Sequence, residues 1–149
     1  VVHPDQILET RRSRAVLAEP FDLHTVVAHS THLGLFLTGL QRGDLALLRA
    51  GLRDVLVEPR RAPLIPGFRA VQQAAFDHDA IGASISGGGP SVFAWFASEA
   101  AARAAAGDMR AGFVDASIEA RAYVSPVAGP RAALVDAPAR QALSAETGA

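Results

Sequence analysis

Two short apolar runs flank three consecutive glycines in the stretch AIGASISGGGPSVFAWF, residues 80–96. Residues 80–85 and 91–96 have the length and apolar character of buried strands. Glycine adopts the positive φ angles that a tight connection needs. The stretch therefore predicts two neighbouring strands joined by the loop Ser86-Gly87-Gly88-Gly89-Pro90.

Helices and two further strands are expected on either side of this pair. The apolar spacing predicts strands over 1–3 and 118–124 and helices over 7–17 and 68–76. Capping residues predict three more helices, which run from Asp22 to Gly43, from Asp44 to Val55 and from Ser98 to 111. The proline-rich segment 57–67 is expected to be stiff and non-helical. A short strand is expected over 132–135, and residues 136–149 are expected to form a peripheral tail.

The order of these elements indicates the fold class. Strand, helices, strand, strand, helix and strand follow one another in a split βαβ pattern. The sequence therefore predicts an α+β, ferredoxin-like sandwich formed by one domain over residues 1–149. The two helices joined at Gly43 and Asp44 should add an antiparallel helical hairpin, because their connection is very short.

The composition excludes several classes of site. Half of the 149 residues are apolar and the net charge is −1, so neither a nucleic acid nor an acidic membrane is expected as a partner. All 14 basic residues are arginine, so no lysine is available to bind phosphate or form a Schiff base. The chain has no cysteine, which excludes disulfides and cysteine-ligated zinc.

A metal site and a membrane anchor are not expected either. His29 and His32 have i, i+3 spacing, but Asp22 is the only carboxylate near them, so we interpret them as ordinary helix histidines. No apolar stretch approaches the roughly 20 residues that span a bilayer, and the cytoplasm is the expected compartment. The chain begins at Val1 inside an expected strand, so we expect it to be part of a longer protein.

The glycine loop is the first candidate ligand site. Consecutive exposed N–H groups in such a loop can bind an anion. The loop is not a Walker A motif, because no lysine follows it and it joins two strands. A long hairpin turn explains the glycines equally well, and the roles of Ser84, Ser86 and Ser91 stay open.

Arginines outside the loop form the second candidate site. Thr10 and Arg14 lie one helical turn apart, and Arg61 lies in the proline-rich segment. A guanidinium is a planar fork that suits a carboxylate or a phosphate, whereas most single arginines simply lie on the surface. Glu58 could orient Arg61 or cap a loop. The arginines expected to be surface residues are Arg11, Arg12 and Arg60.

Three segments resemble motifs of the homoserine kinases, a family within the GHMP kinase superfamily. Residues 55–66 are similar to the family's Val-Glu-Pro-x-Arg segment, and residues 84–91 resemble the third superfamily motif, Ser-Gly-x-Gly-Pro-Ser. Residues 9–15 resemble the Thr-x-x-x-Arg segment that follows a Val-x-x-Pro strand. The resemblance runs from Val1 to about Pro126 and implies the C-terminal domain type of GHMP kinases. Gly88 stands where Ser or Ala is more usual.

The resemblance implies an activity and assigns residues to it. The family uses ATP to phosphorylate the side-chain hydroxyl of L-homoserine, which gives O-phospho-L-homoserine for threonine biosynthesis. By this resemblance, Thr10, Arg14 and Arg61 bind the amino acid, and the two arginines hold its carboxylate. The glycine loop, Ser86, Gly87, Gly88 and Gly89, lines the active site. No catalytic residue is expected in this part of the enzyme.

The resemblance also implies that half of the active site lies outside this chain. The Pro-x-x-x-Gly-Leu-Gly-Ser-Ser phosphate loop does not occur in the sequence. The resemblance therefore implies that ATP and Mg²⁺ are bound mainly by an N-terminal half of the same protein. We expect the chain to be inactive alone and to expose an apolar surface where that half docks.

Two other functions stay open at this point. A different GHMP kinase would act on a mevalonate-type or sugar substrate, although paired arginines favour an amino-acid carboxylate. A non-catalytic ferredoxin-like module would bind a small ligand or a partner chain. The sequence does not determine whether the protein forms a homodimer.

Overall fold

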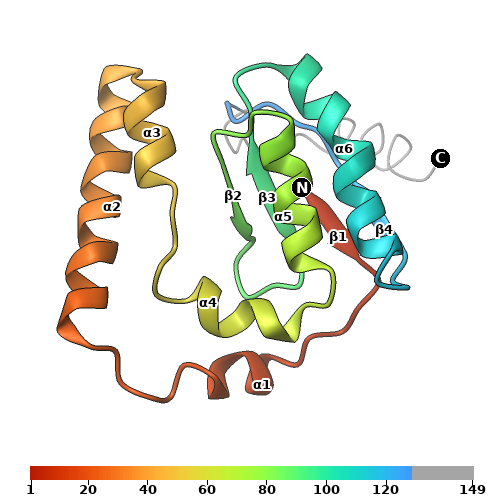
Figure 1. The fold of residues 1–149 in the computed structure, drawn as a ribbon, viewed down its shortest axis with the longest axis horizontal. Helices are drawn as coiled ribbons and strands as arrows, with labels where there is room; N and C mark the ends of the chain where they lie inside the picture. Colours follow the sequence, from red (N-terminus) through yellow and green to blue (C-terminus); the bar gives the residue numbers. More distant parts are fainter. Residues whose placement is uncertain (129–149) are drawn as a thin grey trace, which may run out of the picture.

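Four short strands form one antiparallel sheet in the order β2-β3-β1-β4 (Figure 1). The computed structural model describes residues 1–128. Val2 lies opposite both Val92 and Ala122, so the first strand sits inside the sheet, as the split βαβ arrangement requires. This confirms the predicted α+β, ferredoxin-like class. The strands are β1 (Val2–Pro4), β2 (Gly82–Ile85), β3 (Val92–Trp95) and β4 (Ala120–Ala122).

Helices α2, α3 and α6 begin where the sequence places capping side chains. The Asp22 carboxylate accepts a hydrogen bond from the Thr25 N–H at 2.9 Å, and Asp44 and Ser98 cap later helices in the same way. Gly43 ends the longest helix with a left-handed φ of 63°. The helices are α1 (Thr10–Ala15), α2 (Leu23–Arg42), α3 (Leu45–Gly51), α4 (Glu58–Arg61), α5 (Phe68–Asp77) and α6 (Glu99–Val114), and a 3-10 turn covers Ala62–Leu64.

The hydrophobic core lies between the sheet and the helices α5 and α6. Figure 1 shows these two helices side by side in front of the sheet. Burying each large side chain there stabilises the fold by about 1.5–3 kcal/mol. The largest fully buried apolar side chains are Phe68, Phe113, Ile65, Val2, Val71 and Val92.

The hairpin of α2 and α3 stands to one side of this core (Figure 1). The two helices pack as the predicted antiparallel pair. Gly51 lies so close to the backbone of Phe36 that a Cβ atom there would clash. The Phe36 ring in turn lies 5.6 Å from the Trp95 ring, which joins the hairpin to β3.

Several predicted boundaries are wrong. The proline-rich segment is not free of helix, because Pro59 and Pro63 occupy first-turn positions where a missing N–H group costs no hydrogen bond. Helix α3 ends at Gly51 rather than Val55, and the Arg53 N–H donates to the Gly51 carbonyl instead of to a carbonyl four residues back. Further on, the Asp54 carboxylate accepts from the N–H groups of Leu56 and Val57 in place of helical carbonyls. The first helix and the last strand are shorter than predicted. The strand expected over 132–135 and the tail 136–149 lie outside the described residues.

Candidate functional site

Helix α1 is tied to the glycine loop by Ser13. This side chain is only 4% exposed, and its hydroxyl donates to the Gly88 carbonyl at 3.1 Å. The bond joins residues 75 positions apart in the sequence. Sequence reasoning missed Ser13, because a serine between two arginines carries no signal of a long-range contact.

Arg61 binds both of the segments that Ser13 joins. Its Nε donates to the Ser13 carbonyl at 3.3 Å and its Nη1 donates to the Gly87 carbonyl at 3.2 Å. A guanidinium has five N–H donors, and these two bonds use two of them. The other three can bind a ligand. The structure therefore brings α1, α4 and the glycine loop together. Arg61 belongs to α4 and makes hydrogen bonds to both of the other segments.

Thr10 and Arg14 lie at the exposed side of this junction. They occupy the first and fifth positions of α1, one helical turn apart, and both are exposed. Among residues 1–128, neither side chain makes a hydrogen bond or an ion pair. Helix α1 contains three arginines and no carboxylate, so its charge suits an anionic ligand. The site roles of Thr10 and Arg14 stay predictions.

The glycine loop leaves donors free for a ligand. Ser86 N–H donates to the Ser91 carbonyl at 2.8 Å and Gly89 N–H donates to the Ser86 carbonyl at 3.0 Å, which closes the loop. The N–H groups of Gly87 and Gly88 have no acceptor within the described part of the chain. Two neighbouring free N–H groups of this kind can bind an anion.

The carboxylate of Glu58 holds the platform behind the loop. It is 8% exposed and accepts from the Ser84 hydroxyl at 2.6 Å and from Gln72 Nε2 at 3.1 Å. Gln72 also donates to the Ala83 carbonyl, and Arg69 lies 3.6 Å from the carboxylate. The Glu58 carboxylate makes no hydrogen bond to Arg61 and accepts none from a loop N–H, so it acts on Arg61 only through the position of α4. It anchors the start of α4 to β2 and α5, and this fixes the two elements that carry Arg61 and the glycine loop.

Arg60 is not the surface residue that its sequence neighbourhood predicted. Its guanidinium donates to the carbonyls of Glu19 and Pro20 and lies 3.6 Å from the centre of the Phe21 ring. Cation–π contacts of this kind are favourable. Arg60 therefore holds the linker between α1 and α2 against α4, next to Arg61.

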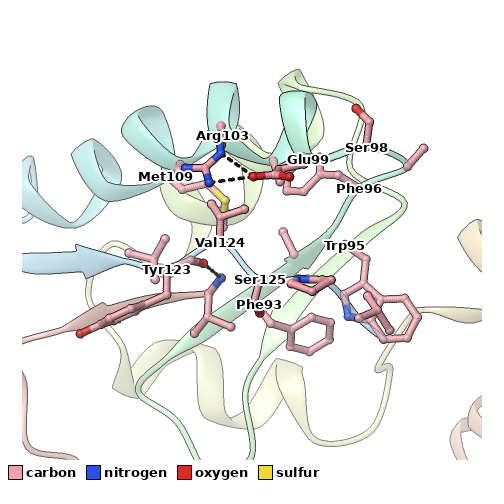
Figure 2. A pocket seen from close by; sticks show the side chains of 18 residues that line it. Phe93, Trp95, Phe96, Ser98, Glu99, Arg103, Met109, Tyr123, Val124 and Ser125 are labelled. Atoms are coloured by element: carbon pink, nitrogen blue, oxygen red, sulfur yellow. Dashed lines mark hydrogen bonds and ion pairs between the residues drawn. The ribbon is translucent and has the colours of Figure 1, made fainter. Parts of the chain in front are cut away.

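A cavity within the described residues lies away from these residues. It measures about 570 Å³ and lies at the α6 side of the sheet, with Phe93, Trp95, Met109 and Tyr123 in its lining (Figure 2). The figure shows Arg103 directed at Glu99, and this ion pair spans 2.7 Å within α6. Thr10, Arg14, Arg61 and the glycine loop do not line this cavity. The candidate site is placed at the junction of α1, α4 and the loop because the bonds of Ser13 and Arg61 bring these segments together.

The described residues give no support for a metal site or a membrane span in this part of the chain. Within residues 1–128, no three His, Asp or Glu side chains are grouped closely enough to hold an ion. None of the helices in that range is long and apolar enough to cross a membrane.

Comparison with known families decides which fold family this is. The family described as "GHMP kinases C terminal" matches residues 36–115, which is more than half of the chain. The chain belongs to this GHMP kinase family. This match confirms the GHMP kinase C-terminal domain type that the sequence motifs predicted.

The relatives of this GHMP domain are homoserine kinases. A homoserine kinase of Xylella fastidiosa is 57% identical over 135 residues, and one of Chlorobaculum tepidum is 39% identical over 137 residues. Both matches cover 91% of this chain and 42% of the relative, at the C-terminal part of the relative. The chain thus spans less than half the length of these relatives.

A solved structure supports the same family. The crystal structure of homoserine kinase from Cytophaga hutchinsonii superposes with a TM-score of 0.82 at 39% identity. The match covers 85% of this chain and 40% of that one. The fold of the chain is therefore similar to part of a solved homoserine kinase.

Proposed function

We propose that this chain is the acceptor-binding half of a homoserine kinase. In this role it contributes to the ATP-dependent phosphorylation of L-homoserine to O-phospho-L-homoserine, a step of threonine biosynthesis. The observation that supports the proposal is the junction at Arg61, which joins the three motif segments at one place. The 57% identity to homoserine kinases supports the choice of substrate.

The amino acid is proposed to bind above α1. Arg14 and the unused N–H groups of Arg61 would hold the carboxylate, because a guanidinium binds a carboxylate through paired hydrogen bonds. The Thr10 hydroxyl would contact the same ligand from the adjacent turn. Arg61 is well placed for this role, since its two backbone bonds hold the guanidinium in position before the ligand binds.

The glycine loop is proposed to face the transferred phosphate. The free N–H groups of Gly87 and Gly88 fit phosphate oxygens, and Ser86 and Gly89 close the loop around them. Ligands for Mg²⁺ are not grouped in the described residues, so the ion and most of ATP would be held by the N-terminal half. Phosphoryl transfer depends mainly on positioning and charge, and this half would position the acceptor hydroxyl.

The activity assay compares the chain alone with the chain joined to an N-terminal half. The upstream part of the Xylella fastidiosa homoserine kinase is a suitable partner, since this chain matches the remainder. We expect homoserine-dependent ADP formation from the joined protein and none from the chain alone. A folded, joined protein that phosphorylates another acceptor but not homoserine would favour a different GHMP kinase.

A matched pair of variants tests the carboxylate role. Arg14→Ala should raise the KM for homoserine about ten- to hundredfold, because it removes a charge-assisted contact worth about 1.5–3 kcal/mol. The KM for ATP should not change. Arg11→Ala is the control, since Arg11 is exposed on the same helix and its side chain makes no hydrogen bond or ion pair among the described residues. Equal effects of the two variants would remove Arg14 from the site.

A further inference from the structure

Helix α2 carries an exposed apolar seam along its whole length. The members of this α2 seam follow one another at alternating steps of three and four residues, which are the a and d positions of a heptad. Five of the six are apolar, with exposed fractions between 40% and 78%. The α2 seam consists of Leu23, Val26, Ser30, Leu33, Leu37 and Leu40.

The α2 seam lies on a side of α2 that the described residues leave exposed. A different side of α2 packs on α3, because Phe36 and His32 lie against Gly51 and Gly39 lies against Leu48. A surface helix normally turns its apolar face towards the core and its polar face towards water. In α2 a row of apolar side chains lies instead on an exposed side.

The surface that covers the α2 seam should itself be apolar. Arg42, the last residue of α2, is its only Arg, Asp or Glu. A charged partner surface would find no counter-charge along the helix and would lose its hydration. A helix with a matching apolar stripe, crossing α2 at about 20°, is the geometry that a heptad seam accepts.

We propose that the α2 seam is the docking surface for the N-terminal half of this kinase. The match covers 42% of the relatives, at their C-terminal part, so the rest of a relative is long enough to cover a 20-residue helix. The α2 seam also begins close to the candidate site. Its first member, Leu23, lies two residues after Phe21, and the Phe21 ring contacts Arg60, the neighbour of Arg61. A single domain could therefore complete the active site and also cover α2.

The inference rests on the two-half arrangement of the proposed function, and chemical labelling separates the two. Because the chain has no cysteine, Leu33→Cys introduces a single thiol into the α2 seam. Ala104→Cys, at an exposed position of α6, is the matched control. Each variant is labelled with a maleimide, first in the chain alone and then joined to a cysteine-free upstream half of the Xylella fastidiosa enzyme.

The expected result is a change at one position only. Joining the halves should slow labelling at position 33 by about tenfold or more, as expected for a thiol that reacts only after local opening, and leave position 104 unchanged. Leu37→Cys should behave like Leu33→Cys. Fast labelling at both seam positions in a joined protein that phosphorylates homoserine would overturn the docking surface and keep the function. Protection without homoserine phosphorylation would support docking and remove the proposed substrate.

A second copy of the chain is the competing occupant. Sedimentation of the chain alone distinguishes it, because a dimer built on the α2 seam would become a monomer in Leu33→Asp. A wild-type dimer with position 33 already protected would overturn the inference in favour of self-association. A monomer with position 33 freely labelled, and protected only in the joined protein, would support it.

Discussion

Two glycines of the loop between β2 and β3 should respond to alanine with opposite signs. At Gly89 the φ angle is +82°, and an added Cβ would lie 3.1 Å from Ile65 and 3.2 Å from Ile85. The left-handed backbone alone costs an alanine about 1–2 kcal/mol, and the crowding adds to this cost. At Gly88 the backbone is not left-handed and no atom lies within 4 Å of the added Cβ. Alanine there should stabilise the protein by about 0.4–1 kcal/mol, because it restricts the unfolded chain.

Urea unfolding of the two variants measures this difference. Gly88→Ala should raise the midpoint and Gly89→Ala should lower it, with the same dependence on denaturant in both. In thermal unfolding, each kcal/mol should correspond to a shift in Tm of about 2–8 °C for a chain of this size. Equal destabilisation by both substitutions would refute the loop geometry, and with it the assignment of free N–H groups at Gly87 and Gly88.

Two further predictions concern carboxylates. Ser84→Ala should destabilise the domain by about 1.5–3 kcal/mol, because it removes a 2.6 Å hydrogen bond to the buried Glu58 carboxylate; a neutral result in urea unfolding would show that Glu58 does not anchor α4. Hydrogen bonds from the Thr25 side chain and N–H hold the pKa of Asp22 below the ordinary aspartate value. The stability that this cap supplies is therefore present above the ordinary pKa and is lost as the pH falls through the lowered one. NMR titration of the Asp22 carboxyl group checks this, and an ordinary pKa would contradict it.

The starts of α2, α3 and α6 and the end of α2 could be predicted because their causes are local. Asp22, Asp44 and Ser98 accept from N–H groups only two or three residues further on, so the signal and its effect lie in the same short segment. Gly43 ends α2 for the same kind of reason. Asp54 also acts locally, but its effect was missed because an aspartate after a helix can cap, turn or stay free.

The side-chain contacts of the candidate site could not be predicted from sequence patterns. Ser13 and Glu58 are polar residues that could equally have been exposed, and only packing buried them. Arg60 and Arg61 are adjacent and chemically identical, yet one holds the α1–α2 linker and the other holds the glycine loop. Which neighbour does which depends on the direction of each side chain from the short helix α4.

The sequence by itself determined the family, the fold class and the segments that form the site. Motif spacing, the periods of apolar residues and capping residues are local properties, and they survive without knowledge of the packing. Only the tertiary structure decided that Arg61 joins Ser13 and Gly87, which lie 48 and 26 positions away from it, and that one side of α2 remains uncovered. Contacts between distant residues form when the core brings their elements together, so they depend on the packing of the whole domain.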